Sequence, residues 1–212
     1  MKKWERALLQ ILYSYFEKDQ RFMSQKRIAE NCGISIGSVN LLIKKLNQLG
    51  AIEIRPQGFR IIDVPRILLY WANTRSFYQD IIGRVSTSTS VEEIEKHLPA
   101  GFALTCFSAF KRKFRKVLHE YDQIYVYGSM ERLRKMFRDT ADVKPNEIIV
   151  LKPDHHLMTL SHQGAVPFAQ MYVDLWQIGS AGKPYIDELN ARIHWIEVGT
   201  IRGIIRRTRK RV

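Results

Sequence analysis

The chain has 212 residues, carries a formal net charge of +13 and is 45% hydrophobic. This apolar share can fill a core, which excludes a disordered chain, and no apolar run reaches the roughly 18–20 residues that span a membrane. Gln10 and Ser14 interrupt the apolar N-terminal stretch, which indicates a cytoplasmic amphipathic helix and not a secretory signal. Cys32 and Cys106 lie far apart without histidines at ligand spacing, so we expect buried free thiols in a reducing cytosol.

The positive charge is concentrated at the two ends of the chain. Residues 1–62 carry 11 lysines and arginines against 5 aspartates and glutamates, residues 63–200 carry 17 against 16, and residues 201–212 carry 6 against none. The middle is therefore balanced, while both ends are basic. This distribution predicts a polyanionic partner, a nucleic acid, that the ends of the chain bind.

The first 62 residues begin with the pattern of three helices. Apolar residues recur at helical spacing in three stretches, which are 4–16, 25–31 and 36–49. Ser24 and Ser35 are suited to cap the second and third helices, because a serine hydroxyl accepts a hydrogen bond from the free amides of a first helical turn. Gly33 can take the left-handed conformation that ends the second helix.

Two short strand-like stretches follow the third helix. They are 51–54 and 59–62, and the turn residues Arg-Pro-Gln-Gly at 55–58 lie between them. Three helices followed by a hairpin predict a winged helix-turn-helix. Ala29 is then expected where the second and third helices cross, because a larger side chain would push them apart.

Val39 and Leu42 are predicted to bury the inner face of the third helix, which leaves small and cationic residues outside. Small polar residues at the start of such a helix can approach base edges in the major groove, and lysines further on can reach phosphates. Arginines beside the tip of the wing are placed to reach phosphate or a minor groove. The predicted DNA contacts are Ser35, Gly37, Ser38, Asn40, Lys44, Lys45, Arg55 and Arg60. Winged helices also dock proteins, so a protein-docking role stays open.

The rest of the chain predicts a second, mixed domain. Residues 63–90 are expected to be a helical connector, with a helix over 67–82. After it, strands are predicted at 123–128 and 147–153, and helical stretches at 91–98, 108–114, 129–137, 166–179 and 182–193. The fold class is therefore α+β. Its parts are a winged helix at 1–62, the connector at 63–90, a mixed α/β domain at 91–200 and a basic tail at 201–212.

Parts of this second domain resemble the AbiEi antitoxin family. The resemblance covers about residues 100–195 and rests on GFALTCFSAF, IYVYGS, EIIVLKPDHH, VPFAQMYVDLWQIG and GKPYIDEL. Its most specific part is a proline, then an aromatic-rich stretch, then Asp174-Leu175, a glycine and a helix. The family usually carries an N-terminal winged helix, as is predicted for this chain. The basic tail from Arg202 onward is not explained by the resemblance.

The resemblance implies a repressor that acts on its own operon within a type IV toxin–antitoxin system. The implied partner toxin is a nucleotidyltransferase-like protein encoded nearby, whose effect is countered without a stable complex. The bound partner would be the duplex DNA of the chain's own operator. Neither a cofactor nor a membrane partner is implied.

The sequence offers little support for catalysis or for a metal site. Gly128-Ser129 follows a strand, as in nucleotidyltransferases, but those enzymes need two carboxylates one residue apart, and Glu131 has no second carboxylate nearby. Asp174 could be a third carboxylate, but a third without the first two cannot bind the metal ions. Ser129 is therefore predicted to be a helix N-cap. His155 and His156 would point to opposite faces of an extended segment, so we expect a polar loop there instead of metal ligands. The chain is not expected to be an enzyme.

Further cationic residues lie outside the predicted recognition helix and wing. The stretch KRKFRK at 111–116 is either a solvated helix face or a phosphate-contacting or RNA-binding face of the second domain. The alternative function is therefore an RNA-binding or protein-docking module, in which this domain and the basic tail carry the activity. The additional candidates for phosphate contacts are Lys26, Arg27, Lys111, Arg112, Lys113, Arg206, Arg207, Arg209, Lys210 and Arg211.

Overall fold

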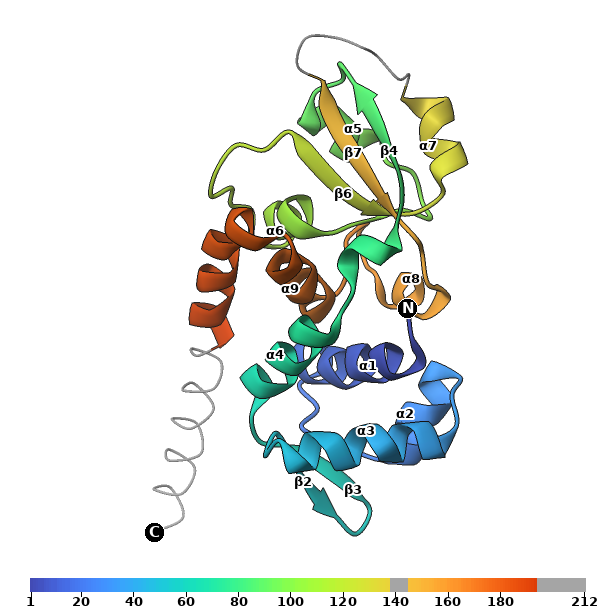
Figure 1. Cartoon of the computed structure of the whole chain (residues 1–212), viewed down its shortest axis with the longest axis vertical. Helices are drawn as coiled ribbons and strands as arrows, with labels where there is room; N and C mark the ends of the chain where they lie inside the picture. Colours follow the sequence, from blue (N-terminus) through green and yellow to red (C-terminus); the bar gives the residue numbers. More distant parts are fainter. Residues whose placement is uncertain (138–144, 194–212) are drawn as a thin grey trace.

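The computed structural model describes residues 1–137 and 145–193. Its helices are arranged around two sheets, a three-stranded antiparallel sheet and a four-stranded mixed sheet (Figure 1). The N-terminal part consists of α1 (Lys3–Lys18), β1 (Phe22–Met23), α2 (Gln25–Cys32), α3 (Ile36–Gln48), β2 (Ile52–Arg55) and β3 (Gly58–Ile61). Its three strands pair in the order β1-β3-β2, all antiparallel. This is the winged helix-turn-helix that the sequence predicts. The short strand β1 was not predicted, since it is defined only by its pairing with β3.

Local side chains set the boundaries of the second and third helices. The Oγ of Ser24 accepts a hydrogen bond from the amide of Arg27 at 3.1 Å, and the Oγ of Ser35 accepts one from the amide of Ser38 at 3.2 Å. Gly33, with φ of +61°, ends α2 in the left-handed conformation. The predicted caps and turn are therefore confirmed, and they fix where α3 begins.

The inner face of α3 is fully apolar. Its buried residues are Val39, Leu42, Ile43 and Leu46. Ala29 of α2 is also buried, and α1, α2 and α3 pack against one another. Because one side of α3 is anchored in this way, the opposite side is held toward solvent.

The second part of the chain surrounds a four-stranded sheet. It consists of α4 (Val64–Thr74), η1 (Phe77–Asp80), β4 (Ile81–Thr87), α5 (Val91–His97), β5 (Ala103–Leu104), α6 (Cys106–Phe114), β6 (Gln123–Tyr127), α7 (Met130–Met136), β7 (Asn146–Leu151), α8 (His155–Leu160), α9 (Phe168–Gln177), η2 (Gly179–Ala181) and helical residues 183–193. The strands lie in the order β4-β7-β6-β5. β6 and β7 are parallel, and the other two pairings are antiparallel.

Alternate residues of the central strands bury two faces of this sheet. Ile148 and Val150 of β7 face the smaller core with Ile94 of α5 and Leu133 of α7. The intervening Ile149 and Leu151 face the larger core, which α6 and α9 also enter. The sheet is therefore covered by helices on both faces, as the predicted mixed α/β domain requires.

Two predicted segments differ from the observed structure. The predicted helix over 67–82 ends at Thr74, and Ile81–Thr87 is the edge strand β4, not part of a helical connector. β4 is stabilised by its pairing with β7, which lies far away in the sequence, so local spacing could not reveal it. The polar loop predicted around His155 and His156 is the helix α8, which begins because the carboxylate of Asp154 accepts hydrogen bonds from two backbone amides.

The winged helix and the second part share one hydrophobic core. In Figure 1, α1 lies between α3 on one side and α8 and α9 on the other, and it packs against all three helices. Buried residues of α1, α4, α6 and α9 belong to one continuous cluster. The winged helix is therefore fixed to the sheet domain through α1. The predicted basic tail at 201–212 and the preceding residues from 194 on lie outside the described part of the chain.

Candidate nucleic-acid interface

The outer face of α3 is a solvent-exposed strip opposite its buried apolar face. At about 100° per residue, this strip runs through positions 37, 41, 44 and 48. The residues there are Gly37, Leu41, Lys44 and Gln48, and all four are exposed. Lys45 is also exposed, at the margin of the strip. The strip combines a small residue at the start of the helix, an apolar residue in its middle and cations toward its end.

The predicted polar contacts at the start of α3 are partly engaged within the protein. The hydroxyl oxygens of Ser35 and Ser38 lie 2.8 Å apart, and Ser35 also caps the helix. Each hydroxyl keeps acceptor capacity for a further partner. The Oδ1 atom of Asn40 is buried without a hydrogen-bond partner among the described residues, so its carbonyl end is turned away from a ligand on the outer face. The geometry therefore favours Gly37, Lys44 and Lys45 over Asn40 as contacts.

The wing carries two exposed arginines around one glutamate. The Nη2 atom of Arg55 lies 2.8 Å from the Oε2 atom of Glu53, and the two side chains remain about half exposed. Arg60 is directly opposite Glu53 in the β2–β3 pairing. Exposed ion pairs contribute little to stability, so Arg55 can exchange this carboxylate for a phosphate. Glu53 thus partly neutralises the wing in the free protein.

Lys26 and Arg27 extend the cationic surface onto α2. Both side chains are exposed, and Lys26 lies 4.0 Å from Glu30 one turn along the same helix. They belong to the first turn of the helix that precedes the recognition helix, where cations can meet the phosphates on either side of a groove. Their placement is compatible with the predicted phosphate contacts.

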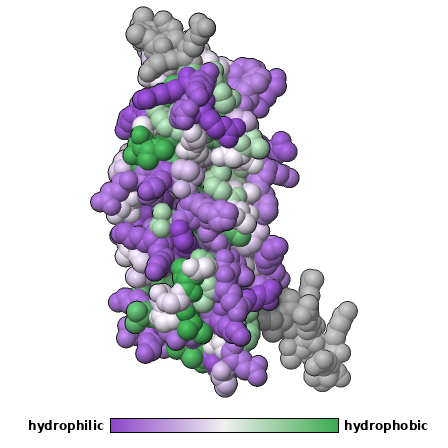
Figure 2. Space-filling model, turned by 90° about the vertical axis from the view of Figure 1, so that its right-hand side faces the viewer, coloured by the Kyte–Doolittle hydropathy of each residue, from purple (hydrophilic) through white to green (hydrophobic). Residues whose placement is uncertain are grey.

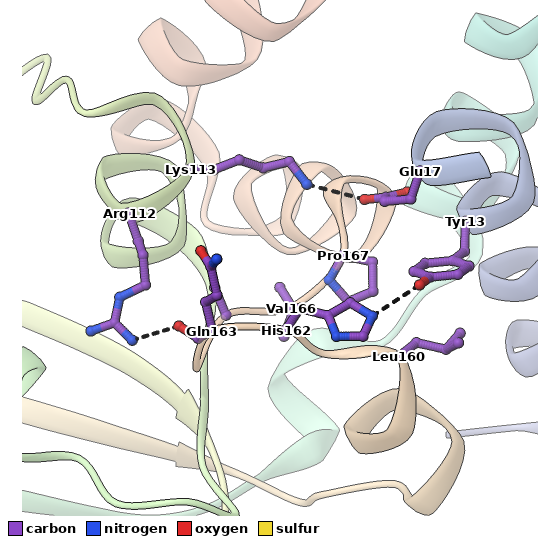
Figure 3. Close-up of a pocket in the computed structure, with 10 residues that line it drawn as sticks. Tyr13, Glu17, Arg112, Lys113, Leu160, His162, Gln163, Val166 and Pro167 are labelled. Atoms are coloured by element: carbon purple, nitrogen blue, oxygen red, sulfur yellow. Dashed lines mark hydrogen bonds and ion pairs between the residues drawn. The ribbon is translucent and has the colours of Figure 1, made fainter. Parts of the chain in front are cut away.

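The cations of α6 form ion pairs and hydrogen bonds with other groups of the protein. The Nζ atom of Lys111 lies 2.9 Å from the Oε2 atom of Glu95. Arg112 donates to two backbone carbonyl oxygens, those of Gln163 and Glu95, at 3.0 and 2.7 Å. Lys113 pairs with Glu17 of α1 at 3.1 Å. Figure 3 shows Arg112, Lys113 and Glu17 around a small pocket between α1 and the second part of the chain. Lys111, Arg112 and Lys113 therefore stabilise the packing of α6, which weakens their assignment as phosphate contacts.

The sequence prediction missed the exposed apolar residues of α3. Leu41 keeps 72% of its surface exposed and Ile36 keeps 50%. Figure 2 shows hydrophobic atoms among hydrophilic ones at the lower end of the molecule, where the winged helix lies. Helical spacing alone would have found Leu41, because it lies on the side of the helix away from the apolar face of Val39, Leu42, Ile43 and Leu46.

Ser129 and Asp174, which were considered for catalysis, have structural roles, and Cys32 is the buried thiol that the sequence predicts. The Oγ of Ser129 accepts a hydrogen bond from the amide of Arg132, which confirms the predicted N-cap of α7. Asp174 is fully buried and pairs with Arg75. Burial raises the pKa of the Cys32 thiol to about 12, which keeps it protonated and unreactive at neutral pH. Over residues 1–137 and 145–193, no group of three or more histidines, cysteines, aspartates or glutamates is arranged to hold a metal ion.

A comparison with known protein families identifies the N-terminal part. Residues 5–53 match the family model of a winged helix-turn-helix DNA-binding domain. The match runs from α1 into β2, and thus includes all of α3. The match supports a DNA-binding regulator. It does not reach residues 100–195, so the resemblance to AbiEi antitoxins is not confirmed.

No curated protein and no solved structure matches the chain. Among its described helices, none combines the length and the apolar composition needed to cross a lipid bilayer.

Proposed function

We propose that the chain is a sequence-specific transcriptional regulator that binds duplex DNA through α3 and the wing and represses its own operon. The observation that carries this proposal is the exposed strip on α3, which includes Lys44 and has Lys45 at its margin, on a domain that matches a DNA-binding family model. The arginines of the wing and the cations of α2 enlarge the same basic surface.

In this proposal α3 enters the major groove with its N-terminal turn toward the bases. Gly37 has no side chain to hold the helix away, and the hydroxyls of Ser35 and Ser38 lie close by. Lys44 and Lys45 lie two turns further along the helix, at a distance suited to the phosphates that border the groove. Arg55 and Arg60 contact a flanking phosphate or minor groove. Phosphate contacts supply the affinity, and the residues at the start of α3 supply sequence preference.

The finer proposal is that this regulator is the antitoxin of a type IV toxin–antitoxin system. Its support is the resemblance of about residues 100–195 to the AbiEi family. The toxin would be a nucleotidyltransferase-like protein encoded nearby and countered without a stable complex. Co-expression with the neighbouring gene products tests this part: rescue of growth without co-purification is the expected result, and no rescue of any toxic neighbour would contradict it.

Titration of the full chain against a duplex from its own upstream region tests the DNA-binding proposal. Fluorescence anisotropy is measured at several salt concentrations, with random duplex and single-stranded RNA as competitors. The double variant Lys44→Ala/Lys45→Ala should weaken binding to every duplex and lower the salt slope by about two units, because each lost phosphate contact removes about one. Lys135→Ala, which changes another exposed lysine on α7, is the matched control and should bind as the parent does.

Competition by random duplex decides whether binding is specific. Retention of the upstream duplex under this competition supports a specific regulator. Displacement by single-stranded RNA, with no effect of the two lysine substitutions, would favour the alternative in which the second domain and the tail bind RNA. The internal ion pairs of Lys111 and Lys113 argue against that alternative.

A further inference from the structure

Leu41 is a component of the α3 outer face to which the proposed function assigns no role. Its 72% exposure is the highest of any large hydrophobic side chain in the described part of the chain. Single exposed leucines are common on protein surfaces. The position of this one is informative, because it lies one turn after Gly37 and one turn before Lys44 and Lys45, in the middle of the strip.

We infer that Leu41 is a specificity-determining residue that contacts the 5-methyl group of thymine in the major groove. This inference rests on the proposed function, in which α3 enters that groove. Among the base edges there, guanine, cytosine and adenine present hydrogen-bond donors and acceptors, and thymine adds the one aliphatic group. A leucine side chain neither donates nor accepts hydrogen bonds. It therefore gains from a methyl group, whereas it would only remove water from the polar edges of the other bases.

The residue one turn before Leu41 allows this contact to form. A Cβ atom on Gly37 would meet no protein atom nearer than the Oγ of Ser35, at 4.0 Å. Nothing inside the protein thus requires a glycine there, although glycine weakens a helix. Its absence of a side chain lets the start of α3 approach the bases, and this brings Leu41 to the depth of the thymine methyl.

The charges around Leu41 favour DNA over a protein as its partner. Lys44 and Lys45 follow it on α3, and Lys26 and Arg27 lie on the neighbouring α2. An apolar side chain bordered by cations fits thymine-containing duplex DNA, because this polyanion has methyl groups in its major groove. A protein partner would need an apolar patch inside an acidic rim, and the test below separates this case.

Replacement of thymine by uracil in the bound duplex tests the inference directly, since it removes only the methyl group. The bound sequence is first selected from a random duplex pool by the full-length protein. Each thymine is then replaced singly, and the affinities of the parent, Leu41→Ala and Leu69→Ala are measured. Leu69 is an exposed leucine on α4, so Leu69→Ala removes the same atoms from a different helix.

At least one replacement should weaken binding by the parent about three- to fivefold, the effect expected for one buried methyl group. Leu41→Ala should bind the thymine duplex more weakly and no longer distinguish thymine from uracil at that position. Its salt slope should equal that of the parent, because no phosphate contact is lost. Leu69→Ala should behave as the parent in every respect.

Three outcomes would overturn the inference. If the parent binds a specific duplex, but Leu41→Ala changes the effect of none of the thymine-to-uracil replacements, the inference is wrong and the proposed function stands. If Leu41→Ala weakens binding to thymine and uracil duplexes equally, or lowers the mass of the protein in solution, Leu41 contacts protein. If the parent selects no sequence at all, the proposed function fails as well.

Discussion

Arg75 and Asp174 form a fully buried ion pair next to the junction of the winged helix and the second part of the chain. The Nε atom of Arg75 lies 2.8 Å from the Oδ1 atom of Asp174, and neither side chain has exposed surface. The same guanidinium lies 3.3 Å from Glu5 of α1, 3.2 Å from Asp80 of η1 and 2.6 Å from the Tyr127 hydroxyl of β6. Burial raises the pKa of Asp174, and Arg75 opposes that shift. One arginine thus joins four elements at the junction.

Removal of one partner of this pair should destabilise the fold strongly. Arg75→Met would leave three carboxylates without their shared cation, and breaking a buried pair typically costs about 3–5 kcal/mol. The free energy of unfolding, from urea titration followed by circular dichroism, measures the loss. The matched control is Asp187→Asn, which breaks the exposed Lys183–Asp187 pair and should cost less than about 1 kcal/mol. Equal small losses in both variants would contradict a stabilising role for the junction.

His156 should make the fold less stable in mild acid. Burial lowers the pKa of His156 below its ordinary value of 6.5, although the carboxylate of Asp154 acts in the opposite direction. Below about pH 6.5 the unfolded chain therefore binds a proton that the folded chain does not, and stability falls as the pH drops further toward the folded pKa. Above that range the full contribution of His156 is present.

The variant His156→Gln removes this titration. Its free energy of unfolding should change less than that of the parent between about pH 7.5 and 5.5, as measured by urea titration at each pH. An unchanged profile in His156→Gln would show that other groups cause the acid sensitivity.

Gly37→Ala should separate stability from DNA binding. The added Cβ atom has room in the free protein, so stability should stay the same or rise by up to about 1 kcal/mol through improved helix propensity. Under the proposed function the same atom would keep α3 from the bases, and affinity for the selected duplex should fall at least tenfold. Thermal unfolding and anisotropy measure the two quantities on one preparation. Affinity equal to that of the parent would mean that Gly37 does not approach the DNA.

Glu53→Gln should strengthen DNA binding. The carboxylate of Glu53 pairs with Arg55 and is opposite Arg60, so its neutralisation frees Arg55 and removes a charge that repels phosphate. We expect affinity to rise about three- to tenfold at low salt and less at high salt, because exposed charges are screened. Anisotropy at two salt concentrations measures this effect. If the wing lies outside the interface, Glu53→Gln will bind as the parent does, whatever Glu30→Gln on α2 does through its partner Lys26.

The winged helix could be predicted from the sequence because its signals are local. Ser24 and Ser35 cap helices through amides three residues away, and Gly33 ends α2 through its own backbone conformation. The inner face of α3 follows from the spacing of its apolar residues. The same spacing places Leu41 on the outer face, so this residue was missed although the signal was present.

The tertiary structure alone decided the parts that depend on distant partners. β4 is a strand because it pairs with β7, and this partner cannot be predicted from the local sequence of 81–87. From the sequence, the cations of α6 were candidates for phosphate contacts. In the structure, Lys113 pairs with Glu17 and Lys111 pairs with Glu95. The sequence by itself thus determined the DNA-binding module, because caps and helical spacing act within a few residues. The availability of each charge was determined only by folding, because an ion pair forms between side chains that the chain brings together across long separations.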